Sequence, residues 1–175
     1  RGADSSDDDS ALNLGLIWTP ADKQRATLNL ASGYRFATLE ERFFSGVTPQ
    51  GEIIGNANLG SEHSLGLDLG YAIDLGAWQV QANLWRTDVD DLIQLQAVAD
   101  GVNGYGNVGK ARLHGLELGL GWQASEQLHL QASSALVRSK DETTGDPLYG
   151  APPLTLTFDA RYQMERLSLG LLYQH

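Results

Sequence analysis

The chain has 175 residues, 42% of them hydrophobic, a formal net charge of −10 and no cysteine. The acidic balance argues against nucleic acid as a partner, because phosphates are bound by basic surfaces, and the lack of cysteine excludes disulfides and thiolate metal sites. No apolar run reaches the roughly 18 residues that suggest a membrane-spanning helix, but the mean hydropathy of −0.25 is compatible with a membrane β-barrel, in which only every second residue must be apolar.

The chain opens with an acidic stretch that contains Asp4, Asp7, Asp8 and Asp9. We expect a solvated loop here, with a calcium or cationic-ligand site as the alternative. Because the first residue is Arg1 rather than Met, we expect a mature or excised piece of a protein.

A first hairpin is predicted between residues 12 and 34. Its first strand has large apolar residues at every second position, namely Leu12, Leu14, Leu16 and Trp18. After a turn at 20–24 its second strand continues the pattern with Ala26, Leu28, Leu30 and Tyr34. This period of two is typical of a strand with one apolar face. Pairing about residue 22 sets Trp18 against Ala26 and Leu16 against Leu28.

Residues 36–63 lack any period and are rich in Gly, Asn, Glu and Pro, which predicts a long connection. The clearest hairpin follows, with Leu65–Leu75 and Trp78–Leu84 joined at 76–77. Pairing sets Ile73 against Val80 and Leu69 against Leu84. One face of this hairpin is apolar, and the other carries small or polar residues such as Asp68. Leu65–Leu75 is long enough to cross a membrane, which takes about 9–11 residues in a strand.

Beyond residue 86 the alternation weakens, and we expect residues 92–98 to continue the same strand after a bulge. Residues 100–106 predict a turn-rich tip. A third hairpin turns near residue 125 and pairs His129 near Gly121, and residues 139–152 form a polar loop. The fourth hairpin turns near residue 164 and sets Tyr162 against Leu167 and Phe158 against Leu171.

These elements make eight strands in four hairpins, with short turns at one end and longer connections at the other. Aromatic residues lie on the apolar face near the short turns, namely Trp18, Trp78, Trp122 and Tyr162. The pattern favours an all-β, antiparallel, up-and-down transmembrane β-barrel segment, with an aromatic girdle at the periplasmic side and lipid against the leucines. We therefore expect Leu67, Leu118 and Leu156 outside, and Asp68, Glu117 and Asp159 toward the lumen. A soluble sandwich or a lipocalin-like barrel would instead gather the leucines in a dry centre.

Three segments resemble TonB-dependent outer-membrane receptors. Residues 32–44 are similar to the family's Gly-Phe-Arg-Ala-Pro-Thr-Leu-Glu-Glu pattern, although Phe36 and Ala37 stand where Ala and Pro are usual. Residues 55–62 resemble its Gly-Asn-Pro-x-Leu-x-x-Glu loop, and residues 107–117 resemble its Asn-x-Gly-x-Ala-x-x-x-Gly-x-Glu strand entry. The order and spacing of the three segments strengthen the likeness.

The resemblance implies that residues 1–175 are an internal to C-proximal part of a plugged barrel of about 22 strands. Alone it could not close, and its two unpaired edges would invite aggregation. In the family context the protein would lie in the outer membrane of a Gram-negative bacterium, contact outer-membrane lipid, and engage TonB through a plug region outside this chain. It would import a ferric siderophore, with haem, cobalamin or another scarce nutrient left open.

The resemblance also suggests site residues. Aromatic and arginine side chains suit an anionic chelate, so the candidate ligand-binding residues are Tyr34, Arg35, Arg42, Phe43, Phe44 and Tyr105. Phe43 and Phe44 could instead only pack the loop. Asp68 and Glu117 are expected to face the lumen and to form hydrogen bonds there rather than contact ligand.

The sequence predicts neither an enzyme nor a cofactor. The four histidines are scattered, His114 and His129 lie too far apart in the predicted hairpin to share a metal, and no nucleophile-elbow, P-loop or zinc-protease motif occurs. The adjacent pairs Asp90–Asp91 and Glu40–Glu41 are expected to be solvated loop charges. A passive eight-stranded barrel or porin piece without energy coupling remains the alternative function, because eight is a permitted strand number.

Overall fold

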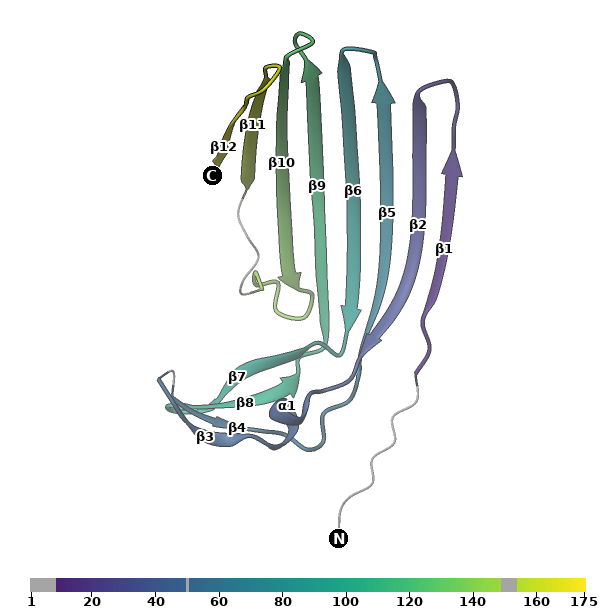
Figure 1. The fold of residues 1–175 in the computed structure, drawn as a ribbon. Coiled ribbons are helices and arrows are strands. Elements are labelled where there is room, and N and C mark those ends of the chain that lie inside the picture. The colour runs from purple at the N-terminus through teal and green to yellow at the C-terminus, as the bar shows by residue number, and fades with distance from the viewer. Residues whose placement is uncertain (1–8, 50, 149–153) are drawn as a thin grey trace.

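The computed structural model describes residues 9–49, 51–148 and 154–175. Its main feature is one broad sheet of eight strands in the order β1-β2-β5-β6-β9-β10-β11-β12 (Figure 1). The strands are β1 Leu12–Trp18, β2 Gln24–Arg35, β5 Glu62–Asp74, β6 Trp78–Asp90, β9 Lys110–Gln123, β10 Leu128–Asp141, β11 Thr155–Gln163 and β12 Ser168–Gln174. All neighbouring pairs are antiparallel, which confirms the predicted meander.

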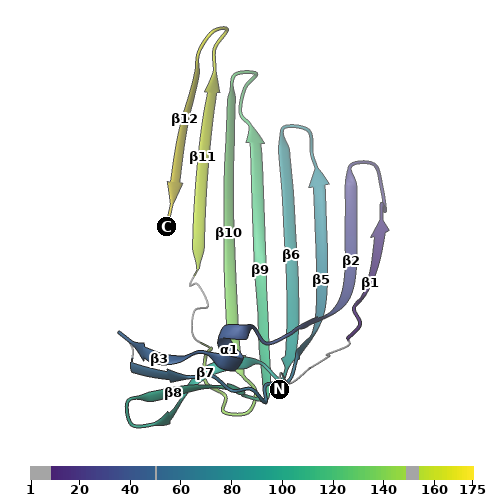
Figure 2. The ribbon, with the colours of Figure 1, turned by 60° about the horizontal axis from the view of Figure 1, so that its bottom comes forward.

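A second, four-stranded sheet lies at the end of the broad sheet opposite the short hairpin turns (Figures 1 and 2). It contains β3 Ser45–Thr48, β4 Gly51–Ile54, β8 Val102–Asn107 and β7 Ile93–Ala99, in the order β3-β4-β8-β7. The short helix α1 Leu39–Phe43 precedes it. We call α1 and these four strands the loop module. Among the described residues no helix is long and apolar enough to cross a membrane.

The registers of the first two hairpins are confirmed. Trp18 is paired with Ala26 and Leu16 with Leu28, while Ile73 is paired with Val80 and Leu69 with Leu84. Their turns are tight, with Lys23 and Gly76 in the left-handed backbone region. The pattern located the centres of both turns correctly, and the position of the turn centre sets the register of a hairpin.

The predicted register of the other two hairpins is wrong by two residues. Tyr162 is paired with Leu169 and Phe158 with Tyr173, and His129 is paired with Gln123 rather than Gly121. The centre of each of these turns lies one residue further along the chain than the pattern suggested, which displaces every partner by two. Because side chains alternate with a period of two, the shift leaves every residue on its predicted face.

The long connections are more ordered than the sequence indicated. Residues 36–63 contain α1, β3 and β4, and residues 92–98 do not extend β6. Instead the chain turns at Asp91, which has a φ of 58°, and β7 enters the second sheet. Residues 102–107 form β8, so the turn-rich tip is limited to the turn at 100–101. The alternation of residues within these segments could not reveal this second sheet, because β4 pairs in parallel with β8, about fifty residues further along the chain.

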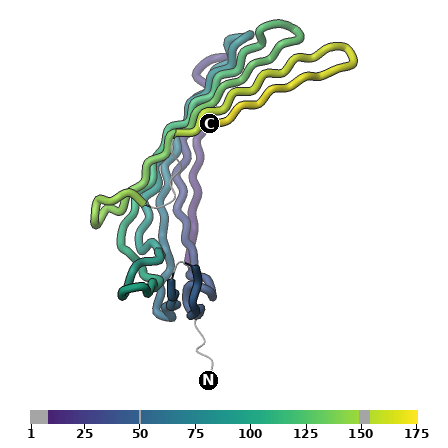
Figure 3. The backbone as a smooth tube through the Cα atoms, turned by 90° about the vertical axis from the view of Figure 1, so that its left-hand side faces the viewer, coloured from purple at the N-terminus to yellow at the C-terminus, as the bar shows by residue number. Residues whose placement is uncertain are grey.

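The leucine face of the broad sheet is not packed into a protein core. Leu67, Leu118 and Leu156 are 40%, 47% and 41% exposed, and the buried apolar residues among the described ones are Leu59, Ile93 and Ala111. All three lie near the loop module. The sheet is curved when seen from the side (Figure 3), and β1 and β12 remain unpaired edges. A soluble sandwich or lipocalin, with the leucines in a dry centre, is therefore excluded for these residues.

Two faces of the broad sheet are referred to below. The apolar face carries Leu67, Leu84, Leu118 and Leu156, and the polar face carries Asp68, Asn83, Glu117 and Asp159.

Candidate functional site

The polar face is hollowed along its middle. A hollow of about 580 Å³ spans β2 to β11 and is lined by Arg25, Thr27, Gln81, Asn83, Glu117 and Ser133, among others. Asp68 lies on the same face, opposite Asn29 on β2 and Trp85 on β6. Neither Asp68 nor Glu117 forms a side-chain hydrogen bond with another described residue; Glu117 is exposed and Asp68 is half-buried.

Glycine on the polar face makes room for a large ring. Trp85 lies opposite Gly115, and a Cβ atom built on Gly115 would stand 2.6 Å from the indole carbon Cε2. Cβ atoms do not occur so close to ring atoms, so any larger residue at 115 must displace the indole. The glycine of the Gly-x-Glu element in the third motif thus leaves room for the Trp85 ring over β9, two positions from Glu117.

Arg35 joins the loop module to the broad sheet. Its Nε donates to Glu62 Oε2 at 2.8 Å and its Nη2 to Glu62 Oε1 at 2.6 Å, while Nη1 donates to both carboxylate oxygens of Glu41 at 3.1 and 3.0 Å. Glu62 also accepts the backbone N–H of Ile93 at 2.7 Å and is 9% exposed. We call Arg35, Glu41 and Glu62 the junction network, because they tie β2, α1, β5 and the start of β7 together.

The local sequence places Glu41 in this network. Thr38 caps α1, with its hydroxyl accepting the N–H of Glu41 at 3.1 Å and its own N–H donating to Glu41 Oε2 at 2.7 Å. This is a capping box, and its Thr-x-x-Glu signature at 38–41 is a signal present in the sequence. Partial burial would raise the pKa of Glu41, but the hydrogen bonds from Arg35 and Thr38 outweigh it and hold that pKa below its ordinary value.

Two asparagines complete the junction. Asn107 Oδ1 accepts the N–H of Gly60 at 3.1 Å, and its Nδ2 donates to the carbonyl of Asp91 at 2.6 Å. Asn56 Nδ2 donates to the carbonyl of Tyr105 at 3.1 Å. The three sequence motifs, far apart in the chain, therefore meet at one place. Sequence reasoning missed Glu62, Asn56 and Asn107 as functional residues, although the motifs that contain them were the available signal.

Five of the six candidate ligand residues lie at the end of β2 or in and directly after α1, and the sixth, Tyr105, lies in β8. Tyr34 and Arg35 end β2 on opposite faces, and the Tyr34 ring centroid lies 5.1 Å from that of Phe36. Arg42 Nη2 donates to the carbonyl of Leu59 at 3.1 Å. Phe43 is 64% exposed on α1, Phe44 is 38% exposed after it, and Tyr105 is half-buried in β8.

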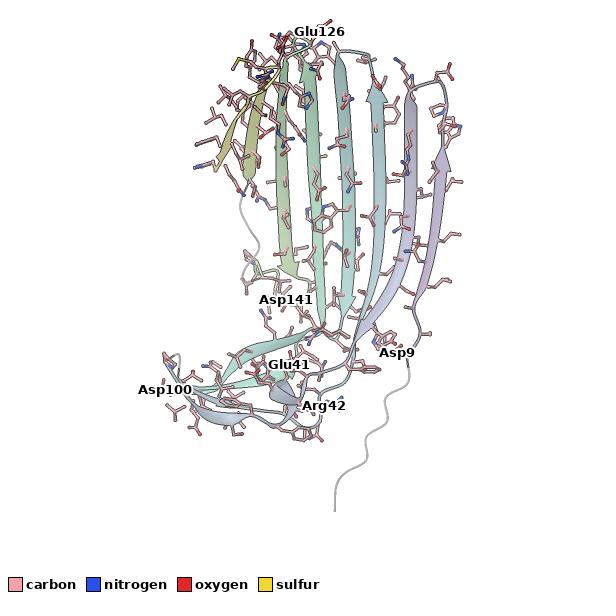
Figure 4. The ribbon with its side chains drawn as sticks, in the orientation of Figure 1. Asp9, Glu41, Arg42, Asp100, Glu126 and Asp141 are labelled. Atoms are coloured by element: carbon pink, nitrogen blue, oxygen red, sulfur yellow. The ribbon has the colours of Figure 1, made fainter. Side chains whose placement is uncertain are left out.

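Figure 4 shows Glu41 and Arg42 at the helix between the two sheets, with Asp100 at the tip of the loop module and Glu126 at the opposite end of the broad sheet. The structure thus gathers Arg35, Arg42 and Phe43 around α1. Tyr105 reaches the same region only through its backbone contact with Asn56.

The other sequence candidates lie apart from the junction. Trp78 and Trp122 are stacked with centroids 4.8 Å apart on the apolar face, beside the short turns. Within the described ranges no three His, Asp, Glu or Cys residues could hold a metal ion. Of the opening acidic stretch, Asp4, Asp7 and Asp8 lie outside the described residues, and Asp9 pairs with His63 Nε2 at 2.7 Å. Asp90 pairs with Lys110 at 3.1 Å.

Comparisons with known proteins agree on one family. A family model described as "TonB dependent receptor-like, beta-barrel" matches residues 1–175. The "Heme/hemopexin utilization protein C" of Haemophilus influenzae is 25% identical over 187 residues, which cover 91% of this chain and 26% of that protein. The "Ferric enterobactin receptor PirA" of Pseudomonas aeruginosa is 31% identical over 128 residues, which cover 68% of this chain and 17% of that protein.

Solved structures show the same fold. The "Copper transporter OprC" aligns with a TM-score of 0.80 and 24% identity, over 93% of this chain and 25% of that one. The siderophore receptor PirA from Pseudomonas aeruginosa aligns with a TM-score of 0.75 and 21% identity, over 94% of this chain and 30% of that one. The chain therefore spans between about a sixth and a third of the length of these relatives.

Proposed function

The chain belongs to the TonB-dependent receptor β-barrel family, and we propose that it forms part of an outer-membrane barrel that imports a ferric siderophore or a similarly scarce, bulky nutrient by TonB-driven transport. The family consists of receptors and transporters rather than enzymes. The main support for the proposal is the family match over the whole chain. The exposed leucines on the apolar face of the broad sheet agree with it.

In the proposed arrangement the apolar face contacts hydrocarbon in the outer membrane of a Gram-negative bacterium. The polar face then borders the lumen, and its hollow beside Glu117 becomes part of the path of the nutrient. The short turns, with the stacked Trp78 and Trp122, face the periplasm, because aromatic residues are enriched at membrane interfaces. The loop module faces the outside, and the contact with TonB is assigned to a plug region rather than to these strands.

The chemistry of the relatives' ligands supports iron chelates without selecting one. The names of the two curated relatives specify haem/hemopexin and ferric enterobactin, and one structural neighbour is named a copper transporter. We favour a ferric siderophore because Arg42 and the exposed ring of Phe43 lie together on α1, and a cationic and an aromatic side chain suit an anionic chelate.

Growth tests check the transport proposal directly. Deletion of the gene should abolish growth on at least one ferric siderophore as the sole iron source, and growth on ferrous salts should be unchanged. Loss of TonB should produce the same defect. Uptake that continues without TonB would overturn energy coupling and favour the passive barrel, whereas normal growth on every chelate would overturn the siderophore assignment.

A matched pair of variants tests the ligand site on α1. Phe43→Ala removes an exposed ring, and Leu39→Ala removes an apolar side chain on the same helix that is 78% exposed. If Phe43 contacts the chelate, its loss should weaken binding roughly 3- to 10-fold, as expected for an aromatic contact of about 0.5–1.5 kcal/mol. Leu39→Ala should leave the Kd unchanged. Equal Kd values for both variants would remove Phe43 from the site.

A further inference from the structure

The apolar face changes character toward the loop module. One row across β6, β9 and β10 consists of Leu84, Leu116 and Leu136, which are paired in register. The next row toward the loop module consists of Arg86, His114 and Arg138. The row after that consists of Asp88, Arg112 and Lys140, and Lys110 lies beyond it, opposite Asp90. The leucine band therefore ends abruptly at a charged zone on the same face.

This zone is basic in a strongly acidic chain. Arg86, Lys110, Arg112, Arg138 and Lys140, which we call the basic belt, make up five of the 12 Lys and Arg residues. Their ion-pair partners are Asp88, Asp90 and Glu142, so two positive charges remain in excess. Within the described ranges Arg138 and His114 form no ion pair, and the Arg138 guanidinium donates only to the carbonyl of Val137 at 3.3 Å.

A hollow lies across the boundary between leucines and belt. It has a volume of about 370 Å³ and is lined by Leu67, Leu69 and Leu84 on one side and by Arg86, Arg112 and His114 on the other. Its lining is thus apolar toward the short turns and cationic toward the loop module. A ligand that matches both halves needs a hydrocarbon chain joined to an anionic head.

We infer that this hollow and the basic belt bind a phosphate-bearing lipid, with an acyl chain along Leu67 and Leu84 and the phosphate between Arg86, His114 and Arg138. The inference rests on the proposed function, because only a membrane barrel exposes this face to lipid. Arginine suits a phosphate since its guanidinium presents paired donors. A free anion would use the arginines but not the leucines below them, and the leucines therefore favour a lipid as the occupant.

The first experiment counts bound lipid on the intact protein in detergent by native mass spectrometry. The probes are phosphatidic acid and phosphatidylcholine with the same acyl chains. We expect phosphatidic acid to bind preferentially, and the double variant Arg86→Gln/Arg138→Gln to weaken that binding roughly 10- to 30-fold, since each basic residue near a lipid head contributes up to about fivefold. Arg112 still pairs with Asp88 in this variant, which limits damage to the fold.

Arg161→Gln is the matched control, because Arg161 is also exposed and paired within its own strand, but lies on the polar face of β11. This control should retain the preference for phosphatidic acid. Equal binding by the double variant and the control would overturn the inference. Complete displacement of phosphatidic acid by inorganic phosphate would also overturn it, because the site would then bind the anion alone.

A second readout separates this inference from the proposed function. The intact protein should insert into phosphatidylcholine vesicles with or without the belt arginines, because the leucine band is unchanged. Failure of the unmodified protein to insert would overturn the proposed membrane location and the lipid site together. Insertion without any preference for phosphatidic acid would overturn the lipid site and leave the transport proposal standing.

Discussion

Replacing Glu62 should release the loop module from the broad sheet. In the junction network Glu62 accepts two hydrogen bonds from Arg35 and one from the N–H of Ile93, and it is almost fully buried. Glu62→Ala removes both acceptor oxygens and with them all three hydrogen bonds. Arg35 keeps its contacts with Glu41, but the N–H of Ile93 is left buried beside an apolar methyl group.

The size of the effect follows from these contacts. Hydrogen bonds to charged groups contribute about 1.5–3 kcal/mol each, and an orphaned buried N–H costs about 1–3 kcal/mol. The Arg35 side chain is 42% exposed, so we halve the first contribution to allow for solvent screening. The free energy of opening the loop module should then fall by roughly 2.5–6 kcal/mol, which corresponds to opening that is at least about 70-fold more frequent.

Amide hydrogen exchange on the intact protein measures this opening. Amides of β3, β4, β7 and β8 should exchange faster in Glu62→Ala, whereas amides in the middle of β5 and β9 should not change, because local units open independently. Glu62→Gln keeps an acceptor for Ile93 and should give a smaller increase.

Glu52→Ala is the control, since Glu52 is an exposed carboxylate in β4 outside the junction network. If the amides of the loop module exchange at the same rate in Glu62→Ala and in Glu52→Ala, the junction network does not anchor the loop module.

Three further outcomes are expected. Gly115→Ala should lower the free energy of unfolding of the intact protein by about 1–3 kcal/mol, as overpacking does, because the new Cβ meets the Trp85 ring, whereas Gly170→Ala, which meets nothing within 4 Å, should leave the denaturation midpoint unchanged. Because the folded-state pKa of Glu41 lies below its ordinary value of 4.5, its contribution is complete above pH 4.5 and is lost as the pH falls through the folded-state value, so pepsin should cleave the loop module faster at lower pH. Glu41→Gln should be cleaved faster throughout and should show less of this pH dependence. Thr38→Ala should cost about 1 kcal/mol by uncapping α1, and exchange of the α1 amides would report it.

Most of the broad sheet could be predicted because the alternation that defines its strands is a local feature of the sequence. Alternation with a period of two predicted all eight strands and the faces of their regular parts, and the turn positions gave the pairing of Trp18 with Ala26 and Ile73 with Val80. It missed the ends of β6, β9 and β10 next to the loop module. In the other two hairpins the turn centre was placed one residue too early, so the predicted partners were displaced by two residues. Alternation cannot detect such a shift, since it leaves all faces unchanged.

The loop module could not be predicted from the pattern. Its strands are four to seven residues long, and β4 finds its partner in β8 across the whole β5–β6 hairpin. Sequence reasoning treated Glu40–Glu41 as a solvated charge pair, but only the fold brings Glu41 to Arg35 and Arg35 to Glu62. The same holds for Asn107 and Gly60, which are forty-seven positions apart in the chain.

By itself, then, the sequence determined the all-β class, the division of the broad sheet into a leucine face and a polar face, and the likeness to one family of receptors. These follow from side-chain alternation and from motifs within a dozen residues, both of which can be read without knowing distant neighbours. Only the tertiary structure decided that the three motifs meet in one junction and that arginines from separate strands form one basic row beside the leucines. Such arrangements depend on strand register across the sheet, and register is fixed by pairing between segments that are far apart in the chain.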